Sequence, residues 1–306
     1  MKTLLLLGLL FAFLGVLAWP GTRSISQTTD VVLVGAGDIA DGFGFDLSGA
    51  FATTALLDAN PTAYVFAVGD HTYGRATDAD FMRAYDPTWG RAKARTIPVI
   101  GHHDYDSLNA AGYFNYFGPV AGNPTQGWYS TDLGALHIVA LNSICPNVGC
   151  GSGGAQDAFL RADLAAHMQQ PCTLALFHEP LFTSSSEITP NTDIRPLFQD
   201  LHDFHADLIV NGHAHNYERF APQDANGALD LANGIIEIVA GTGGDSHFPF
   251  NATLAPNSLV RNADTFGVLK VTVHGSTTPP SFDWQFVPVA GSTFTDLGTQ
   301  TCHPKV

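Results

Sequence analysis

Short apolar runs that end in polar residues recur through the first two thirds of the chain, and they constrain its fold more than any other feature. Each run is rich in Val, Ile, Leu or Phe, and Asp, Asn or His follows where the run ends. Near-continuous apolar runs are typical of strands buried on both faces, as in the sheets of α/β proteins. The six runs span residues 31–38, 63–70, 96–104, 136–142, 173–180 and 206–215.

Helix patterns lie between these runs, so strand and helix alternate along the chain. The helix candidates span residues 48–59, 78–90, 155–168 and 193–205. Such alternation favours an α/β architecture. After residue 230 only strand patterns remain, and we expect these late strands to complete a second sheet that packs on the first.

Length and composition favour one large globular domain. The 306 residues include 45% hydrophobic side chains, and neither an internal repeat nor a dividing linker interrupts them. We expect a catalytic domain over residues 30–290 and a C-terminal tail over residues 291–306. The formal net charge of −15, with only 13 Lys and Arg, argues against nucleic acid or an anionic membrane surface as a partner.

The N-terminus carries an export pattern. Lys2 precedes about fifteen apolar residues, LLLLGLLFAFLGVLA, and a run of this length is typical of a signal peptide. We predict a signal peptide over residues 1–23 and a secreted, periplasmic or extracellular protein with no stable membrane span after its removal. An uncleaved anchor is the alternative, although the run is shorter than the roughly 20 residues that span a bilayer.

The four cysteines agree with export to an oxidising compartment. Three pairings are possible on paper for Cys145, Cys150, Cys172 and Cys302. We favour a Cys145–Cys150 bond, which closes the short CPNVGC loop, and a Cys172–Cys302 bond, which ties down the C-terminal tail. None of the four belongs to a CxxC motif, so we expect structural roles rather than metal binding.

The polar residues that close the strands point to a metal site. In open α/β sheets, ligands bind beyond the carboxyl ends of the strands, where residues from distant parts of the sequence meet. Carboxylates gathered there would repel one another and imidazoles would be partly protonated, and bound cations remove both effects. The residues concerned are Asp38, Asp70, His102, His103, Asp104, Asn142, His178, His213 and His215.

Five motifs built on these residues resemble those of the calcineurin-like metallophosphoesterases, and within that superfamily the secreted purple acid phosphatases. The motifs are GDIA, GDHTY, GHHD, FHEP and GHAHNYER, and they follow the order of the family between residues 31 and 245. The resemblance implies an α/β fold of two packed mixed β-sheets flanked by helices, in a single domain. It also implies a centre of two metal ions, Fe(III) plus a divalent Fe, Zn or Mn ion.

The resemblance assigns a set of ligands to the first metal. Asp38 is similar to the terminal carboxylate on that metal, and Asp70 is similar to the carboxylate that bridges both metals. Tyr73 resembles the tyrosinate that gives the purple enzymes their colour, and the alternative is an ordinary aromatic side chain in a loop. His215 would complete the ligands of the first metal.

The second metal and the catalytic histidine depend on the third motif. His178 and His213 resemble two ligands of the second metal, and in the family an Asn that precedes the catalytic His is a third. Here His102 stands in place of that Asn, and its Nδ1 lies as many bonds from Cα as an Asn Oδ1 does. The alternative is that the His102 ring turns away and leaves the second metal weakly held. The same alignment with the family motif implies that His103 is the catalytic histidine and that Asp104 is the carboxylate that fixes its tautomer and orientation.

These assignments predict a metal-dependent phosphoric ester hydrolase of the acid phosphatase type. A small phosphate monoester would be cleaved by attack of a metal-bound hydroxide, with His103 assisting the leaving group. One alternative is a phosphodiesterase or nucleotidase on the same site, and another is a catalytically impaired metal-binding protein, for which His102 is the only support. The chain lacks the G-x-S-x-G nucleophile elbow, which excludes a serine hydrolase of that type. The sequence leaves the natural substrate, the metal pair and the oligomeric state open.

Overall fold

The computed structural model describes residues 30–41 and 46–305. The predicted signal peptide over residues 1–23 therefore lies outside the described residues. Within those ranges, no helix has both the length and the apolar character needed to cross a bilayer.

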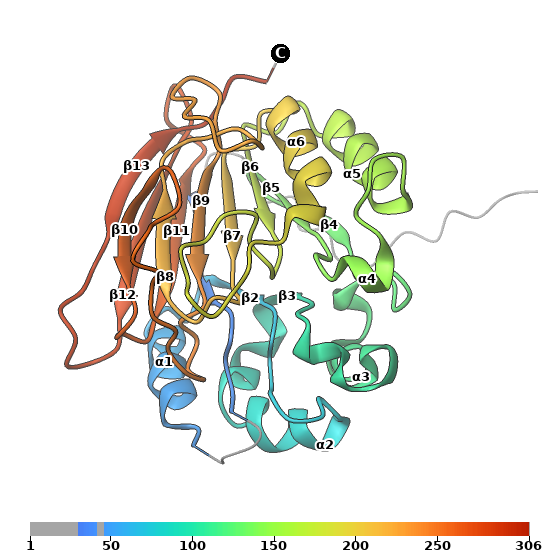
Figure 1. The fold of residues 1–306 in the computed structure, drawn as a ribbon, viewed down its shortest axis with the longest axis vertical. Helices are drawn as coiled ribbons and strands as arrows, with labels where there is room; N and C mark the ends of the chain where they lie inside the picture. Colours follow the sequence, from blue (N-terminus) through green and yellow to red (C-terminus); the bar gives the residue numbers. More distant parts are fainter. Residues whose placement is uncertain (1–29, 42–45, 306) are drawn as a thin grey trace, which may run out of the picture.

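Two β-sheets form the centre of the molecule (Figure 1). The six-stranded sheet has the order β13-β12-β11-β1-β2-β3, and the seven-stranded sheet has the order β10-β8-β9-β7-β6-β5-β4. The first contains β1 (Val31–Ala36), β2 (Tyr64–Val68), β3 (Thr96–Val99), β11 (Gly267–His274), β12 (Ser281–Pro288) and β13 (Leu297–Thr301). The second contains β4 (Tyr129–Leu133), β5 (Leu136–Ala140), β6 (Cys172–Leu176), β7 (Leu208–Asn211), β8 (Tyr217–Phe220), β9 (Ile236–Ala240) and β10 (Ser258–Asn262).

Helices flank the two sheets on their outer faces. The α-helices are α1 (Ser48–Asp58), α2 (Asp78–Asp80), α3 (Ala111–Phe117), α4 (Cys145–Val148), α5 (Ala155–Ala166) and α6 (Arg195–Asp203). A π-helical turn over Phe81–Tyr85 continues α2. The 3₁₀ turns span Trp89–Arg95, His103–Asp106, Leu108–Ala110, Gly118–Ala121 and Thr192–Ile194.

The main hydrophobic core lies between the sheets. Phe66 and Leu269 from the six-stranded sheet pack in one cluster with Ile138 and Leu174 from the seven-stranded sheet. A second cluster joins α1 and α3 to the outer face of the six-stranded sheet, and a third joins α5 and α6 to the outer face of the other. The expected α/β fold of two packed mixed sheets with flanking helices is confirmed.

The prediction that the late strands together complete the second sheet is wrong, because they divide between both sheets. β9 lies between β7 and β8 in the seven-stranded sheet, whereas β11, β12 and β13 extend the six-stranded sheet from β1. β11 pairs antiparallel with β1, and its buried and half-buried residues alternate from Leu269 to His274. Such alternation is typical of an antiparallel strand with one solvated face. The C-terminal segment predicted as a tail also contributes the edge strand β13.

Both disulfides expected from the sequence are confirmed. Cys145 is bonded to Cys150, and Cys172 at the start of β6 is bonded to Cys302 after β13. The second bond therefore links the edge strand of one sheet to the centre of the other.

We expect the two disulfides to contribute unequally to stability. The Cys172–Cys302 bond closes a loop with a sequence separation of 130, against 5 for Cys145–Cys150. Loop-closure entropy then predicts that the free energy of unfolding falls by about 5 kcal/mol when Cys172 and Cys302 are both replaced by Ala. It predicts a fall of about 2 kcal/mol when Cys145 and Cys150 are both replaced. Urea denaturation measures both losses. Equal losses would show that the bonds do not act through the entropy of the unfolded chain.

Candidate metal centre

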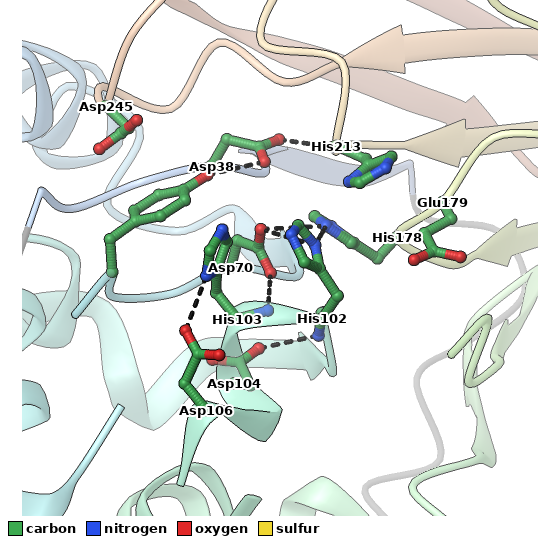
Figure 2. Close-up of polar contacts among 12 residues, drawn as sticks. Asp38, Asp70, His102, His103, Asp104, Asp106, His178, Glu179, His213 and Asp245 are labelled. Atoms are coloured by element: carbon green, nitrogen blue, oxygen red, sulfur yellow. Dashed lines mark hydrogen bonds and ion pairs between the residues drawn. The ribbon is translucent and has the colours of Figure 1, made fainter. Parts of the chain in front are cut away.

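The parallel strands bring the predicted site residues to one edge of the two sheets. β1, β2 and β3 run parallel to one another, and so do β5, β6 and β7. Figure 2 shows Asp38, Asp70, His102, His178 and His213 together beyond the carboxyl ends of the strands. Asn142, after β5, instead donates to the hydroxyl of Tyr105 and the carbonyl oxygen of Gln126. The convergence expected from the strand-end pattern is therefore present.

Tight turns at the strand ends let the side chains approach this closely. Asp38, Asp70 and His213 all have positive φ angles, of 62°, 52° and 69°. Such backbone conformations are strained for residues other than glycine and cluster at functional sites. Glycine is required at Gly69, because an added Cβ would lie 2.3 Å from Nδ1 of His178 and because φ is +86°.

One group of donors matches the predicted ligands of the first metal. The hydroxyl of Tyr73 donates to Oδ1 of Asp38 at 3.0 Å and lies 2.8 Å from Nε2 of His215. Nε2 of His215 is also 3.2 Å from Oδ1 of Asp38. On the other side of the His215 ring, Nδ1 lies 2.6 Å from Oγ of Ser246, which orients the ring and leaves Nε2 facing the group.

A second group of donors is centred on Asp70. Its Oδ2 lies 3.1 Å from Nδ1 of His102 and 3.2 Å from Nε2 of His178, and these two ring nitrogens are 3.1 Å apart. One donor atom from each of Asp70, His102, His178 and His213 lies within 4.8 Å of the others. Nδ1 of His178 contacts the carbonyl oxygen of Val68 at 2.8 Å, so Nε2 is the nitrogen turned to the group. The structure thus places Nδ1 of His102 beside Asp70 and His178, which are two other predicted ligands.

These residues fit a metal ion, because buried donor atoms lack other partners. Oδ2 of Asp70 and Nδ1 of His213 are both buried, and neither has a hydrogen-bond partner among the described residues outside this group. A cation between the donors would satisfy them. Imidazole, carboxylate and phenol donors together suit Zn, Fe or Mn ions.

The charges within the centre also favour metal binding. Burial raises the pKa of Asp70, but His178 and His102 outweigh it and hold that pKa well below its usual value. Burial lowers the pKa of His178, yet Asp70 overcomes this and raises the pKa to about 10. Burial, helped by the neighbouring imidazoles, lowers the pKa of His213 to about 3. His213 is therefore a neutral donor, while a metal would have to displace a proton from His178.

Tyr73 is held as a neutral phenol by its surroundings. Burial, together with Asp38 and Asp70, raises its pKa well above 10. A phenolate at this position therefore requires a cation close by to offset the carboxylate charges.

The partner of His103 differs from the prediction. Nδ1 of His103 lies 2.7 Å from Oδ2 of Asp106, one turn further along the 3₁₀ helix. Asp104, the predicted partner, is fully buried and lies 3.0 Å from Nδ1 of His71, and it accepts a hydrogen bond from the backbone N–H of Gly101 at 2.8 Å. The predicted role of Asp104 in orienting His103 is therefore wrong. In a 3₁₀ helix, residues three apart share one face, so Asp106 is the carboxylate within reach.

Two further carboxylates near the centre were missed by the sequence analysis. Glu179 follows His178, and its Oε2 accepts a hydrogen bond from Nδ2 of Asn191 at 2.5 Å. Oδ2 of Asp245 lies 3.5 Å from Nδ1 of His215. Burial raises the pKa of both carboxyl groups. The available signals were the position of Glu179 next to His178 in FHEP and the segment GTGGDSH around Asp245, which lies five residues beyond the end of β9.

Comparisons with known proteins agree with this geometry. Residues 20–217 match the family model of the calcineurin-like phosphoesterases. A probable inactive purple acid phosphatase 1 from Arabidopsis thaliana is 28% identical, over 83% of this chain and 47% of the relative. Purple acid phosphatase 23 from the same plant is 27% identical, over 65% of this chain and 51% of the relative. The chain thus spans about half the length of these two relatives.

One further relative is not named as a purple acid phosphatase, and two solved structures share the fold of this chain. A nucleotide pyrophosphatase/phosphodiesterase from Hordeum vulgare is 26% identical, over 73% of this chain and 69% of that protein. Among solved structures, purple acid phosphatase PPD1 from yellow lupin aligns with a TM-score of 0.72 and 19% identity, over 91% of this chain and 55% of that one. GAP50 of Plasmodium aligns with a TM-score of 0.62 and 14% identity, over 90% of this chain and 89% of GAP50.

Proposed function

We propose that this chain, which belongs to the calcineurin-like phosphoesterase family, hydrolyses small phosphate monoesters at a centre of two metal ions. The observation that carries the proposal is the division of the buried donors into two groups, which are linked where the backbone N–H of His213 donates to Oδ2 of Asp38 at 2.7 Å. Asp38, Tyr73 and His215 would hold one ion, which we propose is Fe(III). Asp70, His102, His178 and His213 would hold the other ion, a divalent Fe, Zn or Mn ion.

The chemistry divides between the ions and the side chains. When bound, two metal ions activate water as a nucleophile at neutral pH and stabilise the charge that develops on the phosphate. His103 is placed to act on the substrate, because its side chain is 31% exposed beside the donors. When both ring nitrogens of His103 carry a proton, Nδ1–H donates to Asp106 and Nε2–H gives its proton to the leaving oxygen.

A phosphodiesterase is the second candidate, and the barley relative named a nucleotide pyrophosphatase/phosphodiesterase favours it. The names of relatives described as probably inactive support a third outcome, a chain that binds metal without turnover. All three candidates share the same metal centre. They differ in whether a monoester, a diester or neither is hydrolysed.

Hydrolysis of p-nitrophenyl phosphate and of its bis ester, with the metal bound to the same sample quantified, separates these candidates. Fast cleavage of the monoester by protein with two metals per chain is the expected result. Preference for the bis ester would replace the proposal with a phosphodiesterase. Two bound metals without turnover of either ester would contradict hydrolysis and leave a metal-binding protein.

The pair formed by His103 and Asp106 gives a sharper test of the mechanism. We expect His103→Gln to lower kcat by about 10²–10⁴-fold, the range for loss of a positioned acid or base, with metal content unchanged. Asp106→Asn should lower kcat less than His103→Gln does, because Asp106 acts only through His103. Asp78→Asn is the matched control, since Asp78 is an exposed aspartate that contacts Asn115. An unaltered kcat in His103→Gln would remove this histidine from the mechanism.

We also propose that the protein is exported and works outside the cytoplasm. The two disulfides support this, because such bonds form and persist in oxidising compartments. N-terminal sequencing of the protein recovered from the medium or periplasm is expected to begin near residue 24. An N-terminus that retains residues 1–23 would indicate an uncleaved anchor instead.

A further inference from the structure

A second cluster of histidine and aspartate side chains lies at the other end of β5 from the carboxyl edge that bears the metal centre. It joins the hairpin of β4 and β5 to the last turn of α5, and β4 is the edge strand of its sheet (Figure 1). Asp132 on β4 is directly opposite His137 on β5 in the strand register. His167 immediately follows α5 and adds a second imidazole.

Both imidazoles are oriented by Asp163, one turn before the end of α5. Nε2 of His137 lies 2.8 Å from Oδ2 of Asp163, and Nδ1 of His167 lies 2.7 Å from the carbonyl oxygen of Asp163. The other oxygen of Asp163 accepts a hydrogen bond from Oγ of Ser130 at 2.6 Å. A histidine that binds metal through one nitrogen commonly donates the other N–H to a carboxylate or a backbone carbonyl. Here both histidines have that outer contact already.

The remaining nitrogens turn toward the same carboxylate. Nδ1 of His137 is 2.7 Å from Oδ1 of Asp132, and Nε2 of His167 is 3.7 Å from Oδ2 of Asp132. The two rings are stacked, with centroids 4.0 Å apart and planes 14° from parallel. One donor atom from each of the three residues lies within 4.8 Å of the others.

We infer that Asp132, His137 and His167 form a binding site for a divalent transition-metal ion such as Zn²⁺. This site is separate from the centre of the proposed function and does not depend on it. Two imidazoles and a carboxylate form a donor set that zinc takes with a water as the fourth ligand. Ligand atoms around tetrahedral Zn²⁺ stand about 3.3 Å apart, so the 2.7 Å contact between Asp132 and His137 would have to lengthen, and the 39% exposure of Asp132 leaves its side chain room to rotate.

Charge gives a second reason to expect a cation here. Asp132 and Asp163 place two carboxylates around His137, whose side chain is only 1% exposed. Burial lowers the pKa of His137, but hydrogen bonds to Asp163 and Asp132 outweigh it and raise the pKa. A proton on His137 is therefore the competitor of the metal, and binding should release it. The ion would add a further link between the edge hairpin and α5, beside the hydrogen bonds and the stacked rings.

The test compares zinc binding by chelator-treated wild-type protein with that of His167→Gln and Asp132→Asn. Both side chains are partly exposed, so the variants avoid replacing the buried His137. By equilibrium dialysis, each variant is expected to bind one Zn²⁺ per chain fewer than the wild type. The affinity for that ion should fall by more than the roughly 10–100-fold that loss of an outer partner alone produces.

His274→Gln is the matched control. His274 also lies between two carboxylates, 3.0 Å from Asp30 and 3.0 Å from Asp283, but no second imidazole joins it in a three-donor group among the described residues. Its zinc content should equal that of the wild type. Equal zinc content in the wild type and His167→Gln would overturn the inference and leave a protonated His137 as the link.

A measurement on the wild type alone guards against variants that fail to fold. Addition of Zn²⁺ should shift the imidazole ¹⁵N signals of His137 Nδ1 and His167 Nε2 together. Unchanged signals at saturating Zn²⁺ would also overturn the inference. Neither readout uses catalytic activity, so failure of the proposed phosphatase function would not affect the result.

Discussion

Replacing Asp70 by asparagine is expected to remove both metal ions and reduce phosphate ester hydrolysis by at least about 10³-fold. The metal ions supply several kcal/mol of transition-state stabilisation, and each 1.36 kcal/mol corresponds to tenfold in rate. Asp70 is the residue that we propose the two ions share, and its Oδ2 lies within 3.2 Å of ring nitrogens of His102 and His178. Asn keeps the shape of the side chain and an oxygen that can accept from the backbone N–H of His103. It removes the negative charge that two cations would share.

Metal content measured beside kcat shows whether the loss arises through the ions. Asp157→Asn is a suitable control, because Asp157 is a buried aspartate on α5 that contacts the N–H of Gly153 rather than the metal centre. In metal-free Asp70→Asn protein, the pKa of His178 should fall from its raised value, since the carboxylate that raises it is gone. Two tightly bound metals in this variant would contradict the bridging role of Asp70.

The strand-end pattern in the sequence predicts the location of the centre well, because backbone geometry determines it. Asp38, Asp70, His102, His178 and His213 each lie two or three residues beyond the end of a short apolar strand. Parallel pairing then brings them to one edge whatever the rest of the chain does. The same argument explains the success of the fold prediction over the first two thirds of the chain.

Contacts that depend on a single local turn could not be predicted in the same way. HHDYD places two aspartates within three residues of His103, and the sequence alone does not say which one His103 contacts. The 3₁₀ turn over His103–Asp106 directs Asp106 to His103 and buries Asp104 against His71. Sheet membership of the late strands was equally open, because antiparallel partners such as β1 and β11 are more than 200 residues apart and no short connection limits the choice.

His102 is the residue whose replacement separates the candidate functions most clearly. In the structure its Nδ1 lies 3.1 Å from Oδ2 of Asp70 and 3.1 Å from Nε2 of His178. Burial, together with the charge of His178, lowers the pKa of His102, so its ring is neutral near pH 7 and Nδ1 can donate a lone pair. We expect His102→Ala to lose the second metal and to lower kcat by about 10³-fold, as loss of several kcal/mol of metal catalysis implies.

His102→Asn distinguishes ligation from packing. An Asn Oδ1 is as many bonds from Cα as a His Nδ1, so this variant should retain two metals and keep kcat within about tenfold of the wild type, a change of 1.36 kcal/mol or less. The second metal site of this variant should prefer harder metal ions than the wild-type site does, because an amide oxygen replaces an imidazole nitrogen. If His102→Ala keeps both metals and full activity, the ring only lines the site. If His102→Asn is instead much more active than the wild type, the natural histidine impairs turnover, and the chain is closer in function to its relatives named as probably inactive.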